Sequence, residues 1–140
     1  MKRRDRFDLA ASLMSKALDD EKALEALKSN QEIADAIVLF HAQQAAEKSL
    51  KAVVASQGLA FEWTHDLSEL IRQVHDTGVS LPADLEEVDS LTPYAVDYRY
   101  EDPVLADSFA ERDSALNLIR RMRAWAESTI SETQDRERQL

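Results

Sequence analysis

Residues 33–55 read IADAIVLFHAQQAAEKSLKAVVA and contain no Gly or Pro. At a rise of about 1.5 Å per residue, this stretch predicts one helix about 34 Å long, the width of a small domain. Its first half is apolar around most of the helix circumference, whereas a surface helix would carry a single apolar stripe. We therefore expect other elements to pack on more than one side of it, and we expect it to be the central helix.

The second half of this helix carries a polar stripe formed by His41, Gln44, Lys48 and Lys51. Their spacing of three and four residues places them along one helix face. Glu47 stands four residues before Lys51, in the order that favours an ion pair within a helix. The stripe is the first candidate for a ligand-binding face, and the alternative is a solvated charged face.

The composition predicts one all-α domain built as an up-and-down bundle of four to five helices. The chain has 140 residues, 44% of them hydrophobic, and only 2 Gly and 3 Pro interrupt its helix-forming stretches. We expect the domain to span residues 1–140, with its core in residues 5–130. The last ten residues have no apolar face, so residues 131–140 are expected to fray.

The charge and the residue types exclude several classes of function. With 27 acidic and 17 basic residues, the net charge of −10 argues against general DNA or RNA coating. The chain has no Cys, and no two His stand four residues apart, so we expect no metal site and no cofactor. No apolar run reaches the roughly 18 residues of a membrane span, and the basic N-terminus lacks a secretory apolar region. The expected location is the cytoplasm, without a membrane.

The other helices follow from breakers and apolar spacing. A first helix is expected over residues 8–28, and Asn30 is expected to cap the central helix. Gly58 suits the left-handed position that ends the central helix. Thr64 is expected to cap a short helix that Gly78 ends. Pro82 opens another short helix, over residues 82–91.

A last helix is expected from about residue 106 to residue 130, with its arginines largely outward. These are Arg112, Arg120, Arg121 and Arg123. The group from Arg120 to Arg123 is either a solvated face or an interface that pairs with carboxylates of a partner. The two tryptophans, Trp63 and Trp125, are expected to be core or interface anchors.

Three motifs occur in a recognisable order along the chain. They are QQAAEKSLKA at residues 43–52, THDL at residues 64–67, and the dipeptide of Arg99 and Tyr100 just before the last helix. In this order and spacing the sequence resembles the HEPN domain family, over about residues 5–130.

The resemblance implies a helical bundle that usually forms a homodimer. Stand-alone prokaryotic members of this size are often encoded beside a minimal nucleotidyltransferase with which they assemble, in many cases as a toxin and antitoxin. The family also includes proposed nucleotide-binding domains. Many members are metal-independent ribonucleases that use an Arg followed, after four to six residues, by a His.

This sequence departs from the ribonuclease motif. Val104, Leu105 and Ala106 occupy the positions after Arg99 where the His would stand, and every His of the chain precedes Arg99. A ribonuclease would use that His as a general acid or base. We therefore assign no catalytic residue, and the incomplete motif weighs against an enzyme while leaving a divergent ribonuclease as an alternative.

The candidate ligand-binding residues each keep a structural alternative. His41 is either a ligand contact or a satisfied core histidine. His65, near a helix N-terminus, is either an anion-binding residue or a packing residue. Arg99 and its neighbour Tyr100 either hold a nucleobase or phosphate, or belong to a buried network in which Arg99 pairs with Glu47.

Three functions follow in order of preference. The first is a dimeric partner of a small nucleotidyltransferase. The second is an independent nucleotide or phosphate-binding module that uses Lys48, Lys51 and Arg99. The third is a divergent ribonuclease acting on RNA, in which His41 or His65 replaces the missing histidine.

Overall fold

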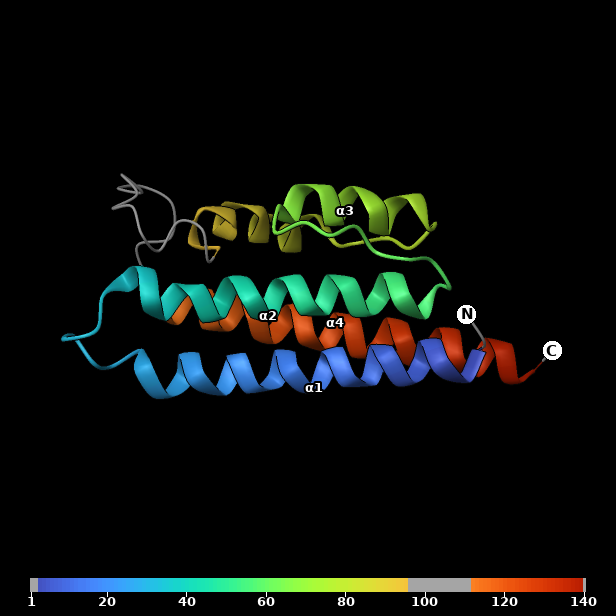
Figure 1. Ribbon diagram of the computed structural model, residues 1–140, viewed down its shortest axis with the longest axis horizontal. Coiled ribbons are helices and arrows are strands. Elements are labelled where there is room, and N and C mark those ends of the chain that lie inside the picture. The colour runs from blue at the N-terminus through green and yellow to red at the C-terminus, as the bar shows by residue number, and fades with distance from the viewer. Residues whose placement is uncertain (1–2, 96–111, 140) are drawn as a thin grey trace.

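The computed structural model describes residues 3–95 and 112–139, and within these ranges the protein is an all-α bundle. Its elements, in chain order, are α1 (Arg3–Leu27), α2 (Asp35–Ser56), α3 (Leu67–Asp76), the 3₁₀ helix η1 (Ala83–Tyr94) and α4 (Arg112–Arg138). Figure 1 shows α1, α2 and α4 side by side along the long axis, with α3 and η1 on the side of α2 away from α1. The predicted all-α bundle of up to five helices is confirmed, and no helix of the described residues is long and apolar enough to cross a membrane.

Helix α2 is the central helix, as the sequence predicts. Its second half is the more deeply buried part, since every residue from Ser49 to Ser56 is buried. The first half, expected to be surrounded, instead leaves Ile37 exposed. Helix α2 contacts α1, α3, η1 and α4, and the small side chains of Ala52, Ala55 and Ser56 allow close approach along its second half.

Two expected helix caps are wrong. The N-cap position of α2 is Ala34, which has no side-chain cap, and Asn30 accepts instead from the backbone N–H of Glu32 in the preceding loop. The cap of α3 is Asp66, which accepts from the backbone N–H of Ser68 at 3.0 Å. Thr64 lies two residues earlier and accepts from the backbone N–H of Asp66. A carboxylate satisfies the free amides of the first turn and also interacts favourably with the helix dipole.

The short helix expected after Pro82 is a 3₁₀ helix, and it is longer than expected. Its buried residues stand three apart, and they are Leu85, Val88, Leu91 and Tyr94. A 3₁₀ helix has 3.0 residues per turn, so this spacing keeps all four side chains on one face. Pro82 occupies the N-cap position rather than the first helical position.

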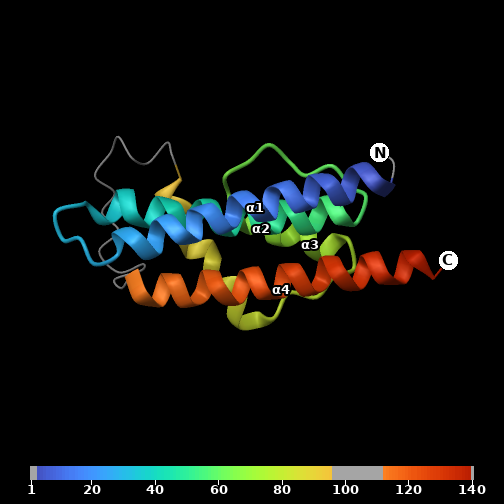
Figure 2. The same ribbon diagram turned by 90° about the horizontal axis from the view of Figure 1, so that it is seen from below.

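Helix α4 continues to Arg138, so the expected end at residue 130 and the expected frayed tail are not what the structure shows. Gln57, just after α2, donates to the buried hydroxyl of Thr133 at 2.8 Å. Arg6 of α1 donates to the backbone carbonyl of Ser56 at 2.7 Å and pairs with Glu137. These contacts join the start of α1 and the ends of α2 and α4 at one end of the bundle (Figure 2).

Arg112 fastens the other end of the bundle, although the sequence predicts an outward side chain. Its guanidinium lies in the α1–α2 connection and contacts five acceptors there. These are the backbone carbonyls of Leu27, Lys28, Asn30 and Ile33, at 2.6–3.3 Å, and a carboxylate oxygen of Asp35 at 2.9 Å. The first residue of α4 therefore satisfies free carbonyls at the C-terminus of α1 and orders the following loop.

Candidate functional site

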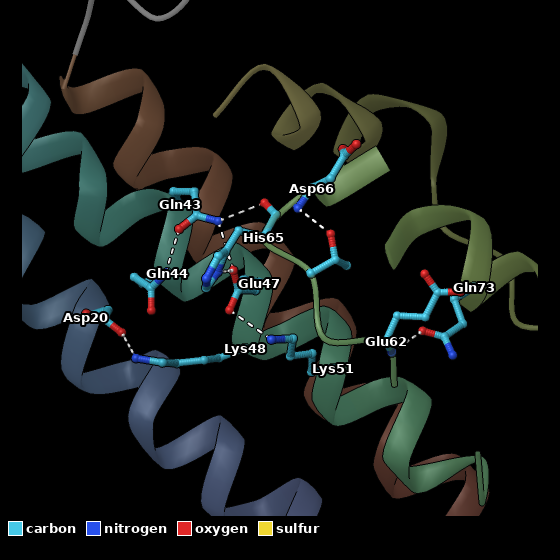
Figure 3. Close-up of polar contacts among 11 residues, drawn as sticks. Asp20, Gln43, Gln44, Glu47, Lys48, Lys51, Glu62, His65, Asp66 and Gln73 are labelled. Carbon is cyan, nitrogen blue, oxygen red and sulfur yellow. Dashed lines mark hydrogen bonds and ion pairs between the residues drawn. The ribbon is translucent and has the colours of Figure 1, made fainter. Parts of the chain in front are cut away.

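The centre of the candidate site is the carboxylate of Glu47, which is only 4% exposed. One of its oxygens, Oε1, lies 2.7 Å from Nδ1 of His65 and accepts from Nε2 of Gln43 at 3.0 Å. The other, Oε2, accepts from Nζ of Lys51 at 3.0 Å. Figure 3 shows these side chains converging from α2 and from the segment before α3. The predicted pair of Glu47 and Lys51 is confirmed.

The same contacts bring two of the three sequence motifs together. Gln43 and Glu47 belong to the first motif and His65 to the second. Gln43 also donates to the backbone carbonyl of His65 at 3.2 Å, so one amide group holds both the carboxylate and the loop. The α2–α3 connection is therefore fixed to α2 through polar contacts.

Burial and hydrogen bonding act in opposite directions on Glu47. Burial raises the pKa of its carboxyl, but the hydrogen bonds from His65, Gln43 and Lys51, together with the charge of Lys51, lower the pKa further than burial raises it. The pKa of Glu47 therefore lies below its ordinary value of 4.5. The site is built to keep this buried carboxylate ionised.

This pKa shift predicts a pH-dependent contribution to stability. Because the folded-state pKa is depressed, the contribution of Glu47 is complete above its ordinary pKa and is lost as the pH falls below it. We expect the difference in unfolding free energy between wild type and Glu47→Gln to shrink between about pH 7 and about pH 3 in denaturant titrations. A difference that stays constant over this range would contradict the assignment, and Asp76→Asn, at an exposed carboxyl, is the control.

The other part of the polar stripe surrounds a second carboxylate, Asp20 of α1. Its Oδ1 lies 3.0 Å from Nδ1 of His41, and its Oδ2 accepts from Nζ of Lys48 at 2.5 Å. Its side chain is largely buried between the two helices. The sequence reasoning missed Asp20, because nothing local distinguishes it from its acidic neighbours in the charged second half of α1.

The predicted stripe is thus divided between two carboxylates. His41 and Lys48 contact Asp20, Lys51 contacts Glu47, and Gln44 donates to Gln43 at 2.7 Å. Each cation of the stripe has a carboxylate partner within the chain, which fits the structural alternative better than a free cationic face. The last two candidates, Arg99 and Tyr100, lie outside the described residues.

Among the candidate ligand-binding residues, His65 is the best placed to accept a hydrogen bond or a proton from a ligand. Its side chain is 47% exposed although its Nδ1 points at the buried carboxylate. In the neutral form, a proton on Nδ1 directed at Glu47 leaves Nε2 as a hydrogen-bond or proton acceptor. Within residues 3–95 and 112–139, no group of three or more His, Asp or Glu side chains is arranged to hold a metal ion.

The same loop exposes a large aromatic side chain. Trp63 is 94% exposed, so the core alternative for this residue is wrong. It packs edge-to-face with Phe61 at 6.2 Å between ring centroids, and Nζ of Lys51 lies 5.4 Å from the Phe61 centroid. Exposed Leu59 stands two residues before Phe61. Trp125, in contrast, is partly buried against the core and donates to the backbone carbonyl of Ser80 at 3.2 Å.

The arginines of α4 form ion pairs across the bundle. Arg123 holds the buried carboxylate of Glu21 through two nitrogens, at 2.7 and 3.2 Å, and Arg120 pairs with Glu25 at 3.1 Å. The hydrogen bonds that Arg123 donates to Glu21 raise the pKa of Arg123 above its ordinary value, against the lowering effect of burial. Arg121 pairs with Asp84. These arginines therefore connect α4 to α1 and η1.

The comparisons with known proteins agree with the sequence motifs. The family model described as HEPN domain matches residues 10–129. The chain is similar to the crystal structure of TT1696 from Thermus thermophilus, with 26% sequence identity and a TM-score of 0.70, over 86% of this chain and 97% of that one. No curated protein matches. Because the family model covers most of the chain, the protein belongs to the HEPN domain family.

Proposed function

We propose that this HEPN domain is a protein-binding subunit that works as a homodimer and assembles in the cytoplasm with a separate minimal nucleotidyltransferase. The observation that carries the proposal is the 94% exposure of Trp63. A Trp side chain buries about 150–250 Å² when it is covered, and Trp is among the residues that contribute most to binding at protein interfaces. The nucleotidyltransferase enters through the family resemblance.

The neighbourhood of Trp63 supports a protein ligand. Phe61 and Leu59 extend the apolar surface along the same loop, and the contact of His65 with Glu47 anchors the loop to α2. An anchored loop loses little conformational freedom on binding, so less of the interface energy is spent on ordering it. The cations of the polar stripe, in contrast, are already neutralised by Asp20 and Glu47.

Trp63→Ser tests the proposal. With the tagged chain co-expressed beside the nucleotidyltransferase of its own genome neighbourhood, the wild type is expected to retain the enzyme on an affinity column. Trp63→Ser is expected to lose at least about tenfold in affinity, the typical cost of a central interface aromatic. Ile37→Ser is the matched control, because Ile37 is also an exposed apolar residue and lies near the opposite end of α2. Equal retention of Trp63→Ser and wild type would refute the role of this surface.

A fluorescence measurement gives an independent readout. Trp125→Phe leaves Trp63 as the one tryptophan of the chain. Its emission is expected to be that of a solvated indole in the free protein and to shift to shorter wavelength when the nucleotidyltransferase is added.

Growth of a host that expresses either protein alone, or both, tests whether the pair acts as toxin and antitoxin.

A second candidate function is nucleotide or phosphate binding at His65, including a divergent ribonuclease activity. The half-exposed ring, oriented by a buried carboxylate, favours it. Calorimetric titration with ATP is expected to show binding that His65→Ala abolishes and His75→Ala preserves. His75 is the control because its exposed ring also contacts a carboxylate, that of Glu86. The absence of binding at millimolar ATP, or equal effects of both variants, would exclude this function. RNA incubated with the same two variants tests the ribonuclease.

A further inference from the structure

A groove lies between α1 and α4, the two helices that run side by side in Figure 2. Its volume is about 350 Å³. Its apolar lining consists of the largely buried Phe7 and Met14, half-buried Ile130 and exposed Ala11. Its polar lining residues are Asp8, Glu127, Ser131 and Gln134. In Figure 1, α1 and α3 lie on opposite sides of α2, so this groove is separate from the α2–α3 loop that carries Trp63.

The spacing of the lining residues suits a helical ligand. Phe7, Ala11 and Met14 stand four and three residues apart and form a stripe along α1. Glu127 and Ile130 stand three apart on α4, which runs antiparallel to α1. The apolar stripe of α1 and Ile130 of α4 therefore face one groove between two antiparallel helices, a place where an amphipathic helix can pack. Of the polar lining residues, Asp8, Glu127 and Ser131 are exposed and Gln134 is half-buried, whereas a small-molecule site would place most of its polar groups inside the cavity.

The charge of the groove indicates a basic ligand. The side chains of Asp8 and Glu127 are 74% and 53% exposed. Asp8 lies 4.0 Å from the exposed guanidinium of Arg4, a long distance for an ion pair. Glu127 shares Arg123 with Glu21, which already holds two nitrogens of that guanidinium. Since the whole chain carries a net charge of −10, a second copy would meet like charge here.

We propose that this groove binds an amphipathic helix of a partner protein, with apolar side chains seated on Phe7, Met14 and Ile130 and Lys or Arg beside Asp8 and Glu127. The proposal goes beyond the assembly at Trp63, because it concerns another face and another set of side chains. Helix α2 already packs against both α1 and α4, and a partner helix in this groove would also contact both of them.

The probe is a labelled synthetic helix of about 18 residues, or five turns, with Leu at every third or fourth position and Lys beside them. The same peptide with Glu in place of Lys is the charge control. Ala11→Trp fills the groove, and Ala26→Trp is its matched control, because Ala26 is also exposed on α1 but does not line the groove. Asp8→Lys with Glu127→Lys reverses the rim, and Asp76→Lys with Asp89→Lys makes the same charge change on α3 and η1.

Fluorescence anisotropy at about 0.15 M salt measures the affinities, because charges more than about 8 Å apart are then largely screened. The Lys peptide is expected to bind wild type, and both Ala11→Trp and the rim reversal are expected to weaken it at least about tenfold. Both controls are expected to stay within about threefold of wild type. Ala26→Trp leaves the groove open, and the reversed charges at Asp76 and Asp89 are exposed and screened, so they act weakly. The Glu peptide is expected not to bind.

Any of four results would overturn the proposal. The Lys peptide does not bind at millimolar concentration, Ala11→Trp binds it with wild-type affinity, or the two charge-reversed variants lose affinity equally. The fourth is that light scattering shows the wild type to be a dimer and Ala11→Trp to be a monomer. The last result would assign the groove to a second copy of the chain. Failure of the Trp63 experiments leaves this test unaffected, since no variant in it changes Trp63.

Discussion

Glu47→Ala is expected to lower the free energy of unfolding by about 3–5 kcal/mol, because it leaves the charge of Lys51 buried without its partner. His65 and Gln43 lose the same acceptor, which adds to the cost of unsatisfied polar groups. Denaturant unfolding near neutral pH measures the loss. Hydrogen exchange of residues 57–66 is expected to rise as well, since Glu47 fastens this loop to α2.

A double variant separates the buried charge from the packing. Glu47→Leu combined with Lys51→Met replaces both charges by apolar groups of similar size, and it is expected to unfold within about 2 kcal/mol of wild type. The single change Lys51→Met is expected to lie between the two, because Glu47 keeps the hydrogen bonds of His65 and Gln43. A loss of less than about 1 kcal/mol in Glu47→Ala would show that Lys51 reaches solvent and that the network is not a buried one.

Arg112→Ala is expected to cost about 2–4 kcal/mol, because several carbonyls at the end of α1 and in the α1–α2 connection lose their charged donor. Arg112→Lys is expected to recover less than half of this loss. A single ammonium cannot reach all the acceptors that the planar guanidinium contacts. Chemical unfolding and the protection of amides in residues 28–34 measure both variants.

Arg121→Ala is the matched control for Arg112. Arg121 also lies on α4 and also pairs with a carboxylate, that of Asp84, but both side chains are half exposed. Its loss is expected to stay below about 1 kcal/mol, as for exposed ion pairs in general. Similar losses for Arg112→Ala and Arg121→Ala would mean that the contacts of Arg112 with the α1–α2 connection add little to stability.

Local features of the candidate site could be read from the sequence. The pair of Glu47 and Lys51 depends only on helical spacing, and the position of Gly58 after α2 depends only on backbone geometry, with φ at +83°. The motifs containing Gln43 and His65 point to the family. None of these features shows that His65 contacts the carboxylate of Glu47, since that distance joins residues 18 positions apart.

Several expectations failed where a local signal competed with tertiary contacts. Thr64 and Asp66 are both good capping residues, and only the path of the chain before α3 decides between them. The end of α4 carries no apolar face, yet the helix continues to Arg138. Its residues Thr133 and Glu137 contact Gln57 and Arg6 there. Sequence composition cannot reveal such contacts, because the partners are distant in the chain.

By itself, the sequence determined the all-α class, the central place of α2 and membership of the HEPN family, because helical periodicity, chain breakers and motif order are properties of neighbouring residues. The tertiary structure alone decided that the polar stripe is divided between Asp20 and Glu47, that Arg112 turns inward, and that Trp63 faces solvent. Whether a charged or aromatic side chain is paired, buried or exposed depends on which distant segments pack beside it, and helical spacing does not contain that information.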